Sequence, residues 1–197
     1  MFTKAYCKML AFEEDIKHCL TTLHKGGVIL YPTDTVWGLG CDATNEAAVK
    51  KIYKLKKRSD AKSMIVLLAS ERDIIKHVAA PDPAVFHFLE KQTKPTTVIF
   101  GGPIGFAENL IAKDNSIAIR IVSDEFCRNL IKRFRKPIVS TSANFSGAPT
   151  PLNFTQIDAG IKSGVDYTVR YRQDDFSEKE PSKIVSWQNG ECIVIRE

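Results

Sequence analysis

The stretch Gly26–Ala43, GGVILYPTDTVWGLGCDA, constrains the fold most, because it joins an apolar run to a polar, glycine-containing segment. Val28–Tyr31 is short, apolar and β-branched at its start, which predicts a buried strand. Pro32 ends this strand, since proline has no backbone N–H to donate to a neighbouring strand. The side chains of residues 33–35 (Thr-Asp-Thr) then follow at the edge where open α/β sheets commonly bind ligands.

Two interpretations of this segment stay open on composition alone. Gly38 and Gly40 allow backbone conformations that other residues avoid, or let a ligand approach closely, so the segment suits a loop that holds a small molecule. An ordinary turn, in which the Thr and Asp side chains hydrogen-bond to nearby backbone groups, explains the same residues.

The composition indicates a folded globular protein. The 197 residues fit one domain, and hydrophobic (44%) and charged (26%) fractions exclude a disordered chain. The longest apolar run, Met64–Ala69, is too short to span a bilayer, and the N-terminus lacks the apolar stretch of a secretory signal. Five scattered cysteines without a CxxC motif predict reduced thiols in the cytoplasm rather than a zinc site or a disulfide framework. The net charge of +5 is compatible with phosphate-bearing ligands or RNA.

Helical spacing and alternation predict an α/β chain with a mixed parallel and antiparallel sheet flanked by helices. We expect helices over 13–25, from Thr44 or Asn45 to about 57, after a capping box at Ser70, from 82–83, and from Ser123 to about 134. Strands are expected at 28–31, 64–69, 96–100, 117–122, 138–140, 165–170, 184–187 and 192–194. Asn189-Gly190 predicts a hairpin between the last two strands, and the polar residues 173–181 predict a surface loop.

Lys56 differs from the other lysines of its helix. Lys50, Lys54 and Lys57 share one face and are expected to be solvated, as cations that complement the helix dipole. Lys56 continues the apolar stripe of this helix, so it should point inward or into a cleft. With Arg58 and Lys62 it forms a cationic group that suits a polyphosphate, and a solvated charged face is the alternative.

Arg120 lies on the strand face opposite Ile117, Ile119 and Ile121. A half-buried arginine in this place requires a carboxylate or phosphate partner, which could be a ligand or a structural salt bridge.

The segment 140–147, STSANFSG, follows a strand and offers hydroxyl and amide groups that could bind anionic oxygen. A serine hydrolase is disfavoured, because there is no GxSxG motif and all four histidines precede these serines. Neither GxxxxGK[ST] nor GxGxxG occurs, and the histidines have no metal-ligand spacing, so no metal site in the chain is predicted.

Taken together, and in the order in which they follow one another along the chain, these segments resemble the YrdC/TsaC family, the L-threonylcarbamoyladenylate synthases. PTDTVWGLG is similar to the family's PT(D/E)TVYGLG, and STSANFSG to its S-x-SAN-x-SG. The other matches are Lys56 and Arg58 to K-x-R, Thr97 to the threonine of a GPLTFVL-like strand, Arg120 to a VAVR-type strand, and Pro181-Ser182 to a late (P/E)-S-T segment. The matches run over about 26–184, and it is their order rather than any one motif that is specific.

The resemblance implies a single YrdC-like domain over 1–197, with a core of about 13–195 and without the extra C-terminal domain of some members. Its expected fold is a twisted mixed sheet with a concave, positively charged cleft. The implied nucleotidyltransferase reaction converts L-threonine, bicarbonate and ATP, with Mg²⁺, into threonylcarbamoyl-AMP and pyrophosphate. The product serves the threonylcarbamoyladenosine modification of tRNA through downstream transferase proteins, and some members also bind double-stranded RNA.

The same resemblance implies roles for individual residues. L-threonine would be held by Thr35, Arg120, Ser140 and Ser182. ATP would be held by Lys56, Arg58, Lys62, Ser142 and Asn144, with Thr97 at the junction of the two ligands and Lys56 and Arg58 as the catalytic pair.

The chain departs from the family pattern at four places. Trp37 replaces a tyrosine, Ser59 a proline and Lys183 a threonine, and Lys62-Ser63-Met64 replaces an Asn-Pro-Leu-like or Lys-Pro-Leu-like triplet.

Two other functions remain as alternatives to the synthase. One is a double-stranded-RNA or ribosome-maturation binding protein without turnover, which the net charge favours but no RRM, KH or double-stranded-RNA motif supports. The other is a related carbamoyl-transferring or regulatory protein that keeps the pocket.

Overall fold

The computed structural model describes residues 4–58, 64–177, 179–188 and 190–197, with side chains from residue 11 onward. Within these ranges, nine strands form one sheet in the order β7-β1-β2-β6-β3-β5-β4-β8-β9. The strands are β1 (Ile29–Tyr31), β2 (Gly38–Gly40), β3 (Ile65–Leu68), β4 (Thr96–Gly101), β5 (Ser116–Ile121), β6 (Ile138–Ser142), β7 (Tyr167–Thr168), β8 (Lys183–Gln188) and β9 (Glu191–Arg196). The β1/β7, β3/β5 and β4/β8 pairs are parallel and the other five are antiparallel, which confirms the predicted mixed sheet.

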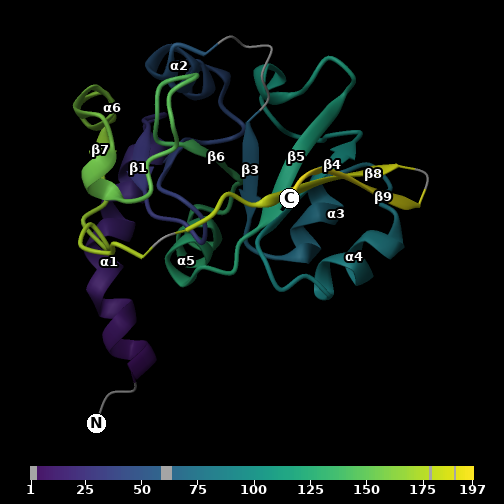
Figure 1. Ribbon diagram of the computed structural model, residues 1–197, viewed down its shortest axis with the longest axis horizontal. Coiled ribbons are helices and arrows are strands. Elements are labelled where there is room, and N and C mark those ends of the chain that lie inside the picture. Colours follow the sequence, from purple (N-terminus) through teal and green to yellow (C-terminus); the bar gives the residue numbers. More distant parts are fainter. Residues whose placement is uncertain (1–3, 59–63, 178, 189) are drawn as a thin grey trace.

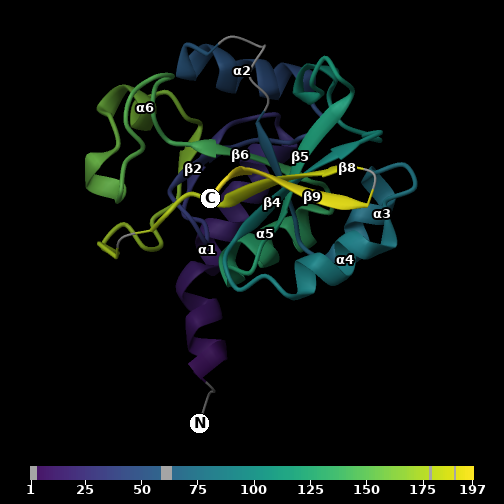
Figure 2. The same ribbon diagram turned by 45° about the vertical axis from the view of Figure 1, so that its right-hand side comes forward.

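Helices flank this sheet on two sides. They are α1 (Lys4–His24), α2 (Glu46–Lys56), α3 (Ile74–His77), α4 (Pro83–Glu90), α5 (Glu125–Phe134) and α6 (Ala159–Ser163). In both ribbon views α2 lies at the top, whereas α1, α5, α3 and α4 lie in the lower half (Figures 1 and 2). The Phe12 ring of α1 packs edge-on against Phe126 of α5, with 5.6 Å between their centroids. Among the described residues, no helix is both long and apolar enough to cross a bilayer.

Two neighbouring rows of side chains cross strands β3, β5, β4 and β8. The first row is entirely apolar and at most 2% exposed; its members, paired from strand to strand, are Val66, Ile119, Val98 and Val185. The neighbouring row lies one residue later on β3 and β5 and one residue earlier on β4 and β8, which run in the opposite direction. Its members are Leu67, Arg120, Thr97 and Ile184. Because successive side chains point to opposite faces of a sheet, the apolar row and the row that carries Arg120 lie on opposite faces.

The segment expected to be a loop around Gly38 and Gly40 is instead strand β2, which pairs with both β1 and β6. Neither glycine has a positive φ angle. A Cβ atom on Gly40 would lie 2.6 Å from the Tyr31 ring and 2.9 Å from the Val139 carbonyl oxygen. Close packing against the aromatic ring, rather than an unusual backbone conformation, therefore requires glycine here.

Several predicted boundaries are corrected by the structure. The first helix begins at Lys4 rather than near residue 13, β6 continues through Ser142, and the predicted strand at 165–170 is only Tyr167–Thr168. The Asp124 carboxylate, not Ser123, caps α5 by accepting a hydrogen bond from the Cys127 N–H at 2.9 Å. Aspartate is the stronger acceptor for this position, since its charge also complements the helix dipole.

Local turn and capping chemistry explains three further outcomes. Asn45 caps α2 by accepting from the Ala48 N–H at 3.1 Å. The Ser70 hydroxyl donates to the Asp73 side chain and makes no backbone cap. The hairpin is confirmed by the pairing of Gln188 with Glu191, whereas Asn189 lies outside the described residues.

Replacement of Gly40 by alanine tests the close packing of β2. Gly40→Ala should lower the free energy of unfolding by about 1–3 kcal/mol, because the added methyl group would overlap both the Tyr31 ring and the Val139 carbonyl. Gly101→Ala is the matched control, since a Cβ atom there has nothing within 4 Å and should change stability by less than about 0.5 kcal/mol. Urea denaturation of the two variants measures this difference, and equal stabilities would contradict it.

Candidate functional site

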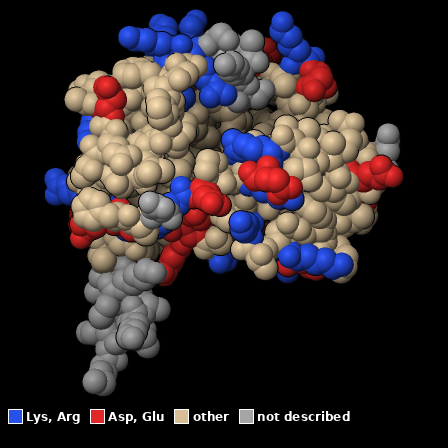
Figure 3. Space-filling model, in the orientation of Figure 1, with Lys and Arg blue, Asp and Glu red and all other residues tan. Residues whose placement is uncertain are grey.

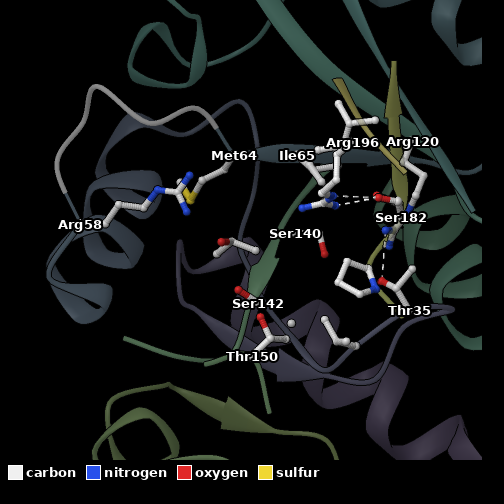
Figure 4. Close-up of a pocket in the computed structure, with 15 residues that line it drawn as sticks. Thr35, Arg58, Met64, Ile65, Arg120, Ser140, Ser142, Thr150, Ser182 and Arg196 are labelled. Carbon is white, nitrogen blue, oxygen red and sulfur yellow. Dashed lines mark hydrogen bonds between the residues drawn. The ribbon is translucent and has the colours of Figure 1, made fainter. Parts of the chain in front are cut away.

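A cavity of about 220 Å³ opens on the face of the sheet that carries Arg120. Its walls come from distant parts of the chain: the segment after β1, the end of α2, the start of β3, β5, β6 and the C-terminal hairpin. It is lined by Thr35, Val36, Gly38, Arg58, Met64, Ile65, Arg120, Ser140, Thr141, Ser142, Thr150, Pro181, Ser182, Ile184 and Arg196. Figure 3 shows a hollow on this face, and Figure 4 shows the lining side chains directed into the cavity.

Arg120 forms the fixed point of the cavity. Its side chain is only 3% exposed, and its guanidinium lies 2.9 Å from the Asp34 carboxylate in an ion pair. Its Nη1 donates to the Thr35 hydroxyl at 3.1 Å (Figure 4). The buried Nε–H has no hydrogen-bond partner among the described residues. Both interpretations of Arg120 therefore apply: it is held by a structural salt bridge, and since it lines the cavity its remaining Nη protons can be donated to a ligand oxygen.

The hydrogen bonds of Thr33 determine what Thr35 can offer to a ligand. The Thr33 hydroxyl donates its one proton to the Val36 carbonyl at 2.8 Å. It must therefore accept from the Thr35 hydroxyl, 3.0 Å away. The Thr35 oxygen in turn accepts from Arg120, which leaves it one lone pair. Thr35 is thus arranged as an acceptor for an ammonium or hydroxyl group in the cavity.

Ser182 lies beside Arg120, directly before the first strand of the C-terminal hairpin, and its side chain contacts β4. Its hydroxyl is 2.8 Å from that of Thr97, which is fully buried and lies behind Ser182 rather than on the cavity wall. The Ser182 carbonyl accepts two hydrogen bonds from Arg196, at 2.7 and 3.2 Å (Figure 4). Burial, and then repulsion by Arg120, lower the pKa of Arg196. Two guanidinium groups therefore face the same cavity.

A β-bulge directs Arg196 into the cavity. Cys192 pairs with Trp187 and Val194 with Val185, on the face that packs against α4. Regular alternation would place Arg196 on that face too, since it lies two residues after Val194. The register shifts by one residue at Ile195, so Arg196 pairs instead with Ile184, which lines the cavity. Arg196 was not predicted as a site residue, because no turn residue or periodicity in the sequence indicates this shift.

Lys56 lies behind the cavity wall and is hydrogen-bonded to the lining residue Ser142. Its side chain is 1% exposed, which confirms that it points inward. The ammonium group donates to the Ser142 carbonyl, to the Asn144 carbonyl at 2.6 Å and to the Asn144 side-chain oxygen at 3.3 Å. These three acceptors satisfy its three protons, which is what allows a charge in this position. Burial, with a smaller contribution from Arg58, lowers the pKa of Lys56 to about 8.

Arg58 lies at the opposite end of the cavity from Arg120 and Arg196 (Figure 4). It follows Lys57, whose left-handed backbone (φ 51°) ends α2 and turns the chain toward the cavity. Burial lowers the pKa of Arg58, which nevertheless stays a cation at neutral pH. Between the two ends lie the hydroxyl groups of Ser140, Thr141, Ser142 and Thr150.

The structure brings most of the predicted site residues together. Six line the cavity: Thr35, Arg58, Arg120, Ser140, Ser142 and Ser182. Lys56, Thr97 and Asn144 lie one layer behind it, each hydrogen-bonded to the lining residues Ser142 or Ser182. Lys62 lies outside the described residues, as does Ser59. Arg196 and Thr150 were missed, and Thr141 was predicted only as part of the hydroxyl-rich segment 140–147, without a role of its own. Thr150 lies beyond that motif, in a segment without any local signal.

The chain itself offers no metal cluster in its described part, where no three His, Cys, Asp or Glu side chains are grouped to hold an ion. The cysteines at 19, 41, 127 and 192 are free thiols. A positive character of the whole cleft stays a prediction, although three arginines line it.

Comparison with known proteins identifies relatives over nearly the whole chain. Residues 21–197 match the Sua5/YciO/YrdC family model, described as telomere recombination. A Saccharophagus degradans protein named threonylcarbamoyl-AMP synthase is 37% identical over 145 residues, 72% of this chain and 75% of that protein. The Photobacterium profundum protein of the same name is 33% identical over 150 residues, 73% of this chain and 80% of that protein.

Solved structures share the fold. P. abyssi Sua5 complexed with L-threonine superimposes with a TM-score of 0.83 at 21% identity and covers 93% of this chain. The match spans 54% of Sua5, so the present chain corresponds to about half of that protein. E. coli YciO superimposes with a TM-score of 0.81 at 22% identity, over 93% of this chain and 89% of YciO.

The pKa of Lys56 predicts how stability depends on pH. In the unfolded chain Lys56 keeps its proton up to the usual pKa of 10.5, whereas in the folded protein it loses it near 8. Between these values the unfolded state binds more protons, so Lys56 makes folding more favourable as pH rises. The unfolding free energy of the wild type, minus that of Lys56→Met, should therefore grow by about 2 kcal/mol between pH 8 and pH 10.

Denaturant titrations of both proteins at several pH values measure this change. Lys54→Met is the matched control, since Lys54 is exposed on the same helix, and its difference from the wild type should stay flat. If the difference in unfolding free energy between the wild type and Lys56→Met stays constant or falls as pH rises, burial does not lower the pKa of Lys56.

Proposed function

This chain belongs to the Sua5/YciO/YrdC family, and on that premise we propose that it is a threonylcarbamoyl-AMP synthase, a nucleotidyltransferase that uses L-threonine, bicarbonate and ATP. One observation carries the proposal: a single cavity combines an anchored arginine–threonine pair, with Arg196 beside it, at one end with a row of hydroxyl groups that leads to Arg58 at the other end. An amino acid and a polyphosphate require these two kinds of partner side by side.

L-threonine is assigned to the end formed by Arg120, Thr35 and Ser182. Its carboxylate can accept from the Arg120 guanidinium, which lines the cavity, and its ammonium or hydroxyl group can donate to the free lone pair of Thr35. Ser140, which lines the same cavity, adds a hydroxyl group beside them. The related P. abyssi Sua5 has been crystallised in complex with L-threonine, which supports this assignment.

ATP is assigned to the part of the cavity that runs from Arg196, next to the L-threonine end, past Ser142 to Arg58 at the opposite end. The hydroxyl group of Thr150 and the two guanidinium groups offer donors to phosphate oxygens, whereas Ser142 donates its hydroxyl proton to the Asn144 side-chain oxygen at 2.5 Å. Lys56 contributes by holding Ser142 and Asn144 in place, because its three protons are already used within the chain. Thr97 contributes in the same way through Ser182. A direct contact of Lys56, Lys62, Thr97 or Asn144 with the nucleotide stays a prediction.

The proposed reaction has two steps. The amine of L-threonine and bicarbonate form a carbamate and water. A carbamate oxygen then attacks the α-phosphorus of ATP, the bond from that phosphorus to the bridging oxygen breaks, and pyrophosphate leaves with the electron pair. Negative charge grows on the leaving pyrophosphate, so fixed arginines stabilise the transition state more than bound ATP. Positioning and electrostatics suffice, and no covalent nucleophile is needed.

Magnesium is proposed to bind together with the nucleotide substrate, as Mg²⁺·ATP. The cavity wall contains hydroxyl groups and arginines but, in its described part, no carboxylate, and Asp34 is engaged with Arg120. Phosphate oxygens and water are therefore the ligands expected for the ion, as is common for Mg²⁺ in nucleotide sites.

The remaining sequence-based expectations concern partners and location. The double-stranded-RNA-binding alternative is not favoured, because the curated relatives are named synthases. Use of the product in tRNA modification, transfer to downstream transferase proteins, contact with RNA and a cytoplasmic location stay predictions.

Pyrophosphate release tests the proposed activity. We expect release that requires L-threonine, bicarbonate and Mg²⁺·ATP together. Arg58→Ala should reduce kcat/KM roughly 10- to 150-fold, because a charged hydrogen bond contributes about 1.5–3 kcal/mol and each 1.36 kcal/mol is a factor of ten. Lys50→Ala, which removes an exposed cation from α2, the helix that precedes Arg58, is the matched control and should retain wild-type activity.

Release that is equally fast without L-threonine would refute the assignment. A panel of other amino acids in the same assay separates the synthase from a related carbamoyl-transferring protein, since the Thr35–Arg120 end should favour L-threonine.

A further inference from the structure

A second cavity, of about 440 Å³, lies at the far end of strands β3 and β6. The segment after β3, the end of α3 and the C-terminal end of α5 form its walls. In both ribbon views α3 and α5 lie in the lower half of the molecule, away from α2 (Figures 1 and 2). None of its lining residues belongs to the cavity around Arg120.

Cations from two different helices surround this cavity. Lys132, Arg135 and Lys136 come from α5 and the residues after it, and Lys76 from α3. Lys136 is paired with Asp42 at 2.7 Å and Lys76 with Asp73 at 2.8 Å. Lys132 and Arg135 form no ion pair with any described residue. Asp73 also lines the cavity, but its side chain is held by Ser70 and Lys76. Lys132 and Arg135 are therefore two cations of this cavity without a carboxylate partner among the described residues.

The dipole of α5 explains only part of this arrangement. Cations near a helix C-terminus are stabilised by the carbonyl groups there, which accounts for Lys132 and Arg135 on their own. It does not account for Lys76 and His77, which reach the same cavity from another helix. Nor does it explain why these side chains surround a hollow instead of lying on a convex surface.

The floor of the cavity is apolar. Leu68, Ala69, Ile131 and Pro137 line it below the charged groups. Each of the first three is at most 5% exposed, so the floor belongs to the packed core and is preformed. Apolar walls with a few convergent polar groups are typical of small-molecule sites, whereas a nucleic-acid backbone is usually bound along an extended charged surface.

We propose that this cavity is a second ligand site, which binds a small phosphorylated compound with its phosphate group between Lys132 and Arg135 and its apolar part on Ala69 and Ile131. A phosphate dianion matches two cations, and the planar guanidinium of Arg135 can donate two parallel hydrogen bonds to it. A monocarboxylate would leave one of the two charges uncompensated.

The site is connected to the first cavity through two adjacent strands. β3 contributes Ile65 to the first cavity and Leu68 to the second. β6, which pairs with it, begins beside Pro137 and ends at Ser142 of the first cavity. Three residues of a strand span about 10 Å, so a ligand in the second cavity would contact the same strands that carry the first.

Methyl NMR of the full chain tests the site directly. Phenyl phosphate is the probe, because it combines a dianion with an apolar ring. We expect saturable shifts of the Ala69 and Ile131 methyl signals, with a Kd at least threefold lower than for inorganic phosphate and no comparable response to benzyl alcohol. The double variant Lys132→Ser/Arg135→Ser should raise the Kd at least tenfold. Arg128→Ser, which removes an exposed cation of the same helix outside this cavity, should leave it unchanged.

Arg58→Ala separates the two cavities. Shifts of Ala69 and Ile131 that persist in this variant support the proposal, and shifts that vanish would assign the effect to the first cavity and overturn it. The proposal is also overturned if the two methyl signals do not move in the wild type, or if the double variant, with its methyl spectrum otherwise intact, binds phenyl phosphate as the wild type does.

Discussion

The buried ion pair between Arg120 and Asp34 imposes the shape of the candidate site. β1 and β5 are four places apart in the sheet, which corresponds to about 19 Å between strands. Asp34, three residues after β1, nevertheless lies 2.9 Å from the Arg120 guanidinium. Three extended residues span at most about 11 Å, so the segment after β1 covers part of this distance and the long Arg120 side chain reaches toward it from β5. Thr35, next to this contact, and Arg120 itself both line the cavity. Removal of either partner would leave a buried charge unpaired, which typically costs about 3–5 kcal/mol.

The alternation of side chains separates this charged region from the core. The row of Val66, Ile119, Val98 and Val185 packs under the helices, and its neighbour places Arg120 and Thr97 on the opposite face. One strand thus contributes to both the apolar core and the cavity without burying a polar group among apolar ones. The same rule made Arg120 identifiable in the sequence, because its neighbours Ile119 and Ile121 indicated which face was apolar. Helical periodicity predicted the inward direction of Lys56 equally well.

What the sequence did not predict depends on contacts between distant segments. The acceptors of Lys56 lie 86 and 88 residues away, so its use as an internal support of Ser142 and Asn144 required the folded chain. Arg196 was missed because a single extra residue, Ile195, reverses the alternation of β9. β2 was missed because Gly40 is explained by close packing against the Tyr31 ring, not by turn chemistry. Strand propensity is low for Gly-Leu-Gly, and tertiary packing overrides it.

Arg120 and Lys56 are buried whereas Arg196 is exposed, and the partners of these three cations suggest what each contributes to the proposed site. Arg120 is bound to a carboxylate, so its charge is largely compensated and its main contribution is a fixed direction for hydrogen bonds. Arg196 and Lys56 are bound to neutral oxygens, the Ser182 carbonyl and the Ser142 and Asn144 oxygens, and therefore keep their full charge. All three are held before any ligand arrives, which lowers the reorganisation needed when charge develops. An amino acid needs orientation and a leaving pyrophosphate needs uncompensated charge, so each ligand is assigned to the part of the cavity that supplies what it requires.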